Sequence, residues 1–110
     1  MESQTEQKHA ESTANHNTDI SIVIPLVNEA DSLTELTSQI EKAIAGEYKY
    51  EILFIDDGST DHSWEIIKDL AGHHDYIRGI KFHRNYGKST ALQTGFEEAA
   101  GKYVVTMDAD

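Results

Sequence analysis

The sequence predicts an α/β fold, namely an open, mostly parallel Rossmann-like sheet with helices on both faces. Short apolar runs alternate with stretches whose apolar residues recur at helical spacing, and this alternation is repeated three times. Polar clusters directly follow the apolar runs, at the positions where parallel sheets bind ligands. We therefore expect right-handed crossovers and a ligand site at the carboxyl ends of the strands.

The first 19 residues differ from the rest of the chain. Residues 1–19 contain almost no apolar side chains, so burial cannot offset the entropy cost of ordering them. They are predicted to be a disordered polar extension, in which His9 and His16 are solvated and bind no metal. The ordered domain is expected to span residues 20–110, with a single core.

Four apolar runs are predicted to be strands. The first, second and fourth are almost continuously apolar, which is typical of parallel strands covered on both faces. The four runs are Ile20–Pro25, Glu51–Ile55, Ile77–Phe82 and Tyr103–Met107.

Three amphipathic helices are expected between these strands, because apolar residues recur there every three or four positions. Those positions are Leu33, Leu36, Ile40, Ala43 and Ile44, then Trp64, Ile67, Leu70 and Ala71, then Leu92, Phe96, Ala99 and Ala100. Gly46, Gly72 and Gly101 follow the last apolar position of each helix, which predicts left-handed C-caps. Trp64 is expected to pack in the core.

Composition excludes several classes of function. The chain has 9 Lys plus Arg against 20 Asp plus Glu, for a net charge of −11, so nucleic acid is not an expected partner. It has no cysteine, which rules out disulfides and thiolate metal sites. Its apolar runs are too short to cross a bilayer.

An acidic turn follows the second predicted strand, at Asp56–Asp61. Gly58 is expected to adopt a positive φ, Ser59 or Thr60 to cap the following helix, and Asp61 to favour the positive N-terminus of that helix. Asp56 and Asp57 supply one more carboxylate than capping needs, which ligand binding could use. The turn after the first strand lacks G-x-G-x-x-G, so an enzyme using nicotinamide or flavin is disfavoured.

A basic segment follows the third predicted strand. Gly87-Lys88-Ser89 resembles the end of a P-loop, but Phe82 stands where the first glycine would be, so that motif is absent. The basic residues in this part of the chain are Arg78, Lys81, Arg84 and Lys88. Lys88, and with less support Arg84, is a candidate for contacting a phosphate, with ordinary solvated side chains as the alternative.

Two aspartates, Asp108 and Asp110, follow the fourth predicted strand. Alternate residues of a strand share a face, so both carboxylates can point in the same direction. Two like charges so close repel each other unless a cation lies between them. The pair therefore indicates a divalent metal site acting on a phosphorylated ligand.

Taken together, these blocks resemble the nucleotide-binding half of family 2 glycosyltransferases, whose fold is of the nucleotide-diphospho-sugar transferase type. The resemblance covers residues 20–110 and rests on Ile22-Val23-Ile24-Pro25 with Asn28-Glu29, Ile55 to Asp61, Arg84-Asn85-Tyr86-Gly87-Lys88 with Ala91-Leu92, and Met107 to Asp110. Within the family, these variants are most similar to polyprenyl-phosphate sugar transferases such as dolichyl-phosphate mannose synthase.

The resemblance implies a donor, a metal and a role for each motif residue. The donor would be a UDP- or GDP-hexose, and Mg²⁺ or Mn²⁺ would bind its diphosphate through Asp108 and Asp110, with Asp108 also contacting the donor. Asp57 would bind the base. Pro25, Asn28 and Glu29 would line the nucleoside pocket, and Lys88 would lie near the phosphates.

The resemblance further implies transfer of a hexose with inversion to a polyprenyl phosphate, in cell-envelope glycan biosynthesis. The general base would lie beyond Asp110, as would any acceptor-binding segment and any membrane contact. We therefore expect a truncated domain that binds donor weakly and transfers no sugar alone. The expected location is the cytoplasm, with the full-length protein at the cytoplasmic face of a membrane.

Three alternatives remain open. Other family 2 members transfer sugar to a saccharide acceptor instead of a lipid phosphate. A receiver-like module would coordinate Mg²⁺ with Asp56 and Asp57 and use no sugar donor. A structural protein without a ligand would leave the acids at the strand ends unexplained.

Overall fold

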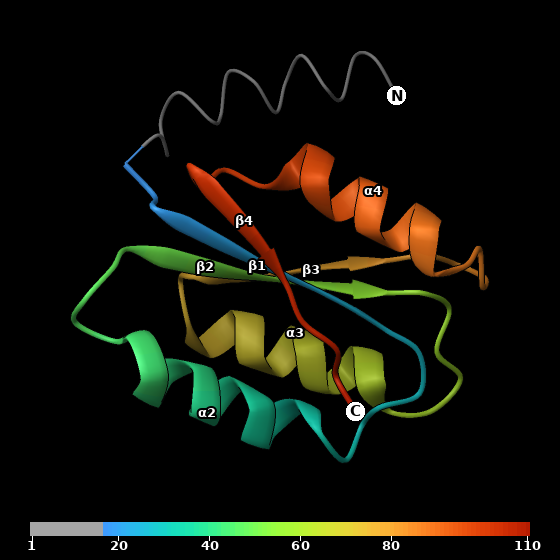
Figure 1. Cartoon of the computed structure of the whole chain (residues 1–110). Coiled ribbons are helices and arrows are strands. Elements are labelled where there is room, and N and C mark those ends of the chain that lie inside the picture. Colours follow the sequence, from blue (N-terminus) through green and yellow to red (C-terminus); the bar gives the residue numbers. More distant parts are fainter. Residues whose placement is uncertain (1–16) are drawn as a thin grey trace.

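The computed structural model describes residues 17–110, and Figure 1 shows one sheet between two helical layers. The elements in chain order are β1 (Ile20–Leu26), α2 (Leu33–Ile44), β2 (Tyr50–Asp56), α3 (Ser63–His73), β3 (Ile77–Lys81), α4 (Lys88–Glu98) and β4 (Tyr103–Thr106). The predicted α/β class is confirmed, as are the four strands and the three helices.

The sheet is parallel, with strand order β3-β2-β1-β4. The chain first builds outward from β1 to β3 and then returns to place β4 on the other side of β1. The strand order therefore reverses between β1 and β4. In open parallel sheets, a ligand crevice forms outside the carboxyl ends of the strands at such a reversal.

Alternate strand residues point to opposite faces and build two apolar layers. Toward α2 and α3, side chains such as Phe54 and Ile24 join the larger core cluster with Leu33 and Ile67. Toward α4, a smaller cluster contains Val23, Leu53, Ile55 and Ala91. Figure 1 shows α2 and α3 below the sheet and α4 above it, as expected for helices on both faces.

The predicted helix ends need correction. Gly46 has a positive φ of 85° just after the end of α2, as expected. Gly72 lies inside α3 instead of after it. Gly101 has no positive φ and lies directly against β1, where an added Cβ would be 2.6 Å from the Ser21 nitrogen. Two of the three glycines are thus not left-handed caps.

The start of α3 also differs from the prediction. The helix begins at Ser63 with His62 at its N-cap, and neither Ser59 nor Thr60 caps it. The Asp61 carboxylate accepts the Ser63 amide at 2.9 Å, as expected for an acid at the helix start. The Ser59 hydroxyl accepts a hydrogen bond from the Asn28 amide, and the Thr60 amide donates to the Asn28 side chain. These hydrogen bonds join the loop after β1, where Asn28 has a positive φ of 56°, to the loop before α3.

The predicted polar extension falls outside the described residues except for its last three positions. Of these, Thr18 and Asp19 accept backbone hydrogen bonds from Lys102 and Tyr103, and the Asp19 amide donates to the Lys49 carbonyl. The ordered chain therefore begins at least two residues before the expected boundary at residue 20. Trp64 is partly buried and packs against the larger core cluster, close to its predicted place.

Candidate functional site

A cavity of about 200 Å³ opens at the carboxyl ends of the neighbouring strands β1 and β4, where the strand order reverses. Its lining consists of Pro25, Leu26, Val27, Glu29, Asp57, Lys88, Asp108, Ala109 and Asp110. Six of the seven residues that the sequence singled out for the donor and the metal are in this set. Side chains up to 85 positions apart in the chain thus face one space.

The wall beside β1 is formed by the end of the strand and the residues that follow it. Pro25 and Leu26 are the last strand residues, and Leu26 pairs with Asp56 of β2. The Glu29 amide donates to the Ser63 hydroxyl at 3.0 Å, which ties this loop to the start of α3. Asn28 is not part of the lining, because its side-chain oxygen accepts the amides of Thr60 and Asp61. Its role in nucleoside binding stays a prediction.

The two carboxylates of the acidic pair at the end of β2 have different partners. Asp56 is fully buried, and one of its carboxylate oxygens accepts the Ser59 amide at 2.8 Å. Asp57 lines the cavity, but its Oδ1 accepts the Tyr86 amide at 2.7 Å and its Oδ2 accepts the Gly87 amide at 3.0 Å. The two carboxylates are therefore not placed side by side to share a magnesium ion, which weighs against a receiver-like module.

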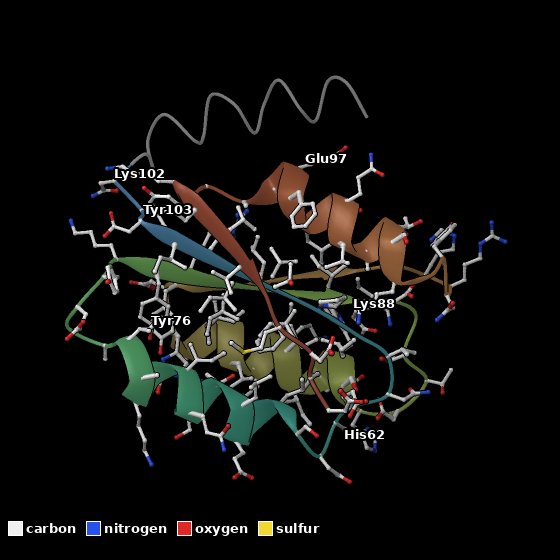
Figure 2. The ribbon with its side chains drawn as sticks, in the orientation of Figure 1. His62, Tyr76, Lys88, Glu97, Lys102 and Tyr103 are labelled. Atoms are coloured by element: carbon white, nitrogen blue, oxygen red, sulfur yellow. The ribbon has the colours of Figure 1, made fainter. Side chains whose placement is uncertain are left out.

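Lys88 is the first residue of α4 and reaches the end of β4. Its Nζ lies 2.9 Å from Asp108 Oδ1, and both side chains are 63% exposed. Figure 2 shows Lys88 at the end of the molecule opposite Lys102 and Tyr103, which mark the start of β4. The hydrogen bond and the charge of Asp108, with Asp110 adding to them, raise the pKa of the Lys88 amine above its ordinary value of 10.5. The amine is therefore a cation across the physiological range.

Strand β4 ends one residue earlier than predicted, at Thr106, so both acids follow the strand. The alternation nevertheless continues beyond its end. Met107 and Ala109 pack against the larger core cluster, whereas Asp108 and Asp110 are exposed and line the cavity. This arrangement turns the two carboxylates away from the core and toward solvent, as the sequence pattern predicted.

The donor set suits a cation that also binds a phosphorylated ligand. Within residues 17–110, no group of three or more His, Cys, Asp or Glu side chains is close enough to enclose a metal ion. Asp108 and Asp110 offer two carboxylates at an open cavity. Mg²⁺ is typically bound through one or two carboxylates together with substrate phosphates and water, so the two residues fit such an ion.

The other basic residues of this part of the sequence, including the second phosphate candidate Arg84, do not line the cavity. Arg78 is in β3, and its guanidinium bonds Glu51 at 3.1 Å and the Glu98 carbonyl at 2.6 Å, near the amino ends of the strands. The Lys81 amine lies over the Trp64 ring. The Arg84 guanidinium is stacked on the Tyr86 ring at 4.7 Å and does not line the cavity.

A buried polar network at the amino ends of the strands was not predicted from the sequence. Glu51 accepts hydrogen bonds from the Ser21 hydroxyl at 2.5 Å, the Ala100 amide at 2.7 Å and Arg78. The Ser21 hydroxyl in turn accepts the Gly101 amide at 2.8 Å. The available signal was a charged residue at the start of a buried strand, which requires a partner.

Comparison with known proteins gives a consistent result. The family model described as "Glycosyl transferase family 2" matches residues 21–110. The putative glycosyltransferase CsbB of Bacillus subtilis is 42% identical over 92 residues, covering 83% of this chain and 28% of CsbB. Undecaprenyl-phosphate 4-deoxy-4-formamido-L-arabinose transferase of Shewanella sediminis is 46% identical over 99 residues, covering 87% of this chain and 30% of that protein. The chain thus spans less than a third of the length of these curated relatives.

Solved structures show the same fold. S. aureus TarS (residues 1–349), in complex with UDP, superposes with a TM-score of 0.74 at 22% identity, over 84% of this chain and 27% of that one. The mannosyltransferase PcManGT from Pyrobaculum calidifontis, in complex with GDP-Man and Mn²⁺, superposes with a TM-score of 0.73 at 23% identity, over 96% of this chain and 39% of that one. No helix within residues 17–110 is long and apolar enough to cross a membrane.

Proposed function

This chain belongs to glycosyltransferase family 2, and we propose that it binds the nucleotide-diphosphate sugar donor of a transferase whose acceptor is a polyprenyl phosphate. One observation carries the proposal: Asp108, Asp110 and Lys88 line one cavity at the strand-order reversal, and the Lys88 amine lies 2.9 Å from Asp108. This arrangement provides acids for a cation and a cation for a phosphate within one space. The remainder of the proposed activity requires residues outside this chain.

The diphosphate is proposed to bind between the two aspartates and Lys88. Asp108 and Asp110 would hold a divalent cation, Mg²⁺ or Mn²⁺. When bound, that ion would neutralise negative charge on the departing nucleoside diphosphate. Lys88 adds a second positive charge beside the two aspartates, and its pairing with Asp108 holds it at the cavity before the donor arrives. In the donor complex, the phosphate would compete with Asp108 for this amine.

The nucleoside is proposed to occupy the wall built by the end of β1. Pro25 and Val27 offer apolar surface there, and Glu29 offers a carboxylate that can accept hydrogen bonds from ribose hydroxyls. Complexes of structural relatives with UDP and with GDP-Man support a uridine or guanosine diphosphate donor as the class. The arabinose transferases among the relatives carry undecaprenyl-phosphate in their names, which supports a lipid-phosphate acceptor.

We propose that the general base and the acceptor-binding segment lie in the part of the protein beyond residue 110. An inverting displacement needs a base that removes the acceptor proton. In this proposal each carboxylate of the cavity already has a task, because Asp57 is bonded to two backbone amides, Asp108 and Asp110 would hold the cation, and Glu29 would bind the ribose. The 110-residue chain alone is therefore expected to bind donor nucleotide weakly and to transfer no sugar.

Isothermal titration calorimetry of this chain with UDP and with GDP tests the proposal. Binding is expected in the presence of Mn²⁺ and expected to be lost when a chelator removes the metal ion. Asp108→Ala and Asp110→Ala are each expected to weaken metal-dependent binding by at least about tenfold. The proposal fails if the affinity is the same with chelator present, or if both variants bind as tightly as the wild-type chain.

A matched control removes one acidic side chain far from the cavity. Asp75 is exposed and lies in the turn that precedes β3, at the amino ends of the strands. Asp75→Ala changes the net charge by the same amount as the two site variants, so it is expected to leave nucleotide affinity unchanged. A comparable loss in this variant would assign the effect to overall charge instead of to the cavity.

A further inference from the structure

The loop between β3 and α4 is attached to the rest of the molecule through Asp57. Its carboxylate oxygens accept the backbone amides of Tyr86 and Gly87 at 2.7 and 3.0 Å, and its carbonyl accepts the Asn85 side chain at 3.2 Å. Within residues 17–110, the hydrogen bonds that leave residues 83–87 for other parts of the chain end on Asp57, apart from the one that the Gly87 carbonyl accepts from Ala91 in the first turn of α4. Only 4% of Asp57 is exposed.

The neighbouring glycine keeps the same two segments in contact. Gly58 has a φ of 82°, and a Cβ at this position would lie 2.5 Å from the Arg84 carbonyl carbon and 2.6 Å from the Asn85 nitrogen. No side chain fits between the two backbones, so the turn after β2 and the loop after β3 touch directly. This contact brings the Asp57 carboxylate within reach of the amides at 86 and 87.

The loop leads directly into the residue that faces Asp108. Gly87, with a φ of 107°, is the N-cap of α4, and Lys88 is the first helical residue. A displacement of the backbone at residue 87 therefore moves the start of α4 and, with it, the stem of Lys88. The hydrogen bonds of Asp57 end one residue before the lysine whose amine lies 2.9 Å from Asp108.

We propose that Asp57 is a positioning residue, which fixes the 84–87 loop so that Lys88 stands at the phosphate side of the cavity. This inference rests on the proposed function for its ligand but assigns Asp57 a task different from the base contact that the family resemblance implies. A base contact would use the Asp57 carboxylate directly. The positioning task predicts that ligands without a base depend on Asp57 as well.

The substitution Asp57→Asn separates the two tasks. A carboxamide has one acceptor oxygen and one NH₂ donor, so one of the two backbone amides would face a donor instead of an acceptor. The probes are Mn²⁺-pyrophosphate, which has no base, and Mn²⁺-UDP. The variant is expected to bind both about tenfold more weakly than the wild-type chain. Loss of UDP affinity with unchanged pyrophosphate affinity would overturn the proposal in favour of a base contact.

A second measurement needs no ligand. Amide hydrogen exchange at Tyr86 and Gly87, followed by NMR, is expected to accelerate about tenfold or more in Asp57→Asn. Each of these amides either loses its hydrogen-bond acceptor or is bonded to a weaker one. Nuclear Overhauser contacts between Lys88 and Asp108 are expected to weaken in the same variant. Unchanged exchange at both amides would refute the positioning role. If the wild-type chain binds neither probe, the proposed function fails and these two readouts still decide the role of Asp57.

Two further variants test whether a general loss of folding could explain these changes. Asn85→Ala removes the bond to the Asp57 carbonyl and leaves the carboxylate intact, so it is expected to produce a smaller change in the same readouts. Asp61→Asn alters another carboxylate that accepts two backbone amides, those of Ser63 and Ala30, and it lies outside the cavity lining. Exchange at residues 86 and 87 and pyrophosphate affinity are expected to stay unchanged in Asp61→Asn. A similar change in both aspartate variants would contradict the proposal.

Discussion

The two ends of the sheet use the same types of charged residue for opposite purposes. At the amino end, Glu51 is buried and accepts hydrogen bonds from Ser21, Arg78 and the Ala100 backbone. At the carboxyl end, Asp108 is 63% exposed and bonded to Lys88 alone among the described side chains. We call the first set, Ser21, Glu51, Arg78 and the backbone of residues 98–101, the amino-end network.

The difference lies in how far the polar groups are satisfied within the chain. In the amino-end network, removing one partner leaves buried polar groups without a hydrogen bond. These bonds therefore contribute to the stability of the fold. In the cavity, Asp108, Asp110 and Lys88 are exposed to water, and an exposed pair such as Lys88 and Asp108 contributes little to folding. Their unused hydrogen-bonding and coordinating capacity remains available for a ligand. The comparison predicts that variants at one end change stability and variants at the other change binding.

The largest loss of stability is expected from Glu51→Ala. The Ser21 hydroxyl, the Ala100 amide and the Arg78 guanidinium would all lose their shared acceptor. Because 40% of the Arg78 side chain is exposed, the cost should be below that of a fully buried pair, at about 2–4 kcal/mol of unfolding free energy. Urea unfolding followed by circular dichroism measures it. Glu65→Ala, on the exposed face of α3, is the control and should change stability by less than about 0.5 kcal/mol.

A smaller loss is expected from Gly101→Ala at the same end. The added Cβ would lie 2.6 Å from the Ser21 nitrogen and 2.8 Å from its hydroxyl oxygen, so the turn before β4 must move away from β1. Overpacking of this kind costs about 1–3 kcal/mol. Gly72→Ala provides the contrast, because nothing lies within 4 Å of the new Cβ and alanine favours a helix by about 0.5–1 kcal/mol. Equal melting temperatures for the two variants would contradict the assigned contact.

Lys88→Met should weaken ligand binding and leave stability unchanged. The pair with Asp108 is exposed, so the midpoint of urea unfolding is expected to stay unchanged within error. Affinity for Mn²⁺-UDP is expected to fall about three- to tenfold because a phosphate loses a cationic partner. Calorimetry and unfolding on the same sample provide both values. A variant that unfolds more easily but binds normally would show that the distinction between the two ends is wrong.

The smallest expected effect is on the free energy of unfolding at acidic pH. The hydrogen bond from Ser63 lowers the pKa of Asp61 below its ordinary value of 3.8. A lowered folded-state pKa contributes stability above pH 3.8, and this contribution is lost as the pH falls through the folded-state value. The advantage of the wild-type chain over Asp61→Asn in urea unfolding should therefore shrink on acidification. An advantage that grows at low pH would contradict this sign.

Much of the fold could be predicted from the sequence because its signals are local. The apolar runs placed all four strands to within one residue at every end, and helical spacing identified the three helices α2, α3 and α4. The positive φ of Gly58 followed from its place in a tight turn. The helix ends were less predictable, since Gly72 and Gly101 look like C-caps in sequence but are used inside a helix and against a strand.

For the site, the sequence determined which residues face the ligand end, and only the tertiary structure decided how each is engaged. The alternation that brings Asp108 and Asp110 to the cavity is a property of extended backbone and can be read along the chain. Asn28 and Asp57 are instead engaged by amides about 30 positions away, and Glu51 is bonded to Ser21 and Arg78. Such partners depend on strand order and register, which determine which distant backbones meet. Sequence reasoning therefore found the acids, while only the packed sheet decided which of them are committed to structure and which face the cavity with capacity for a ligand.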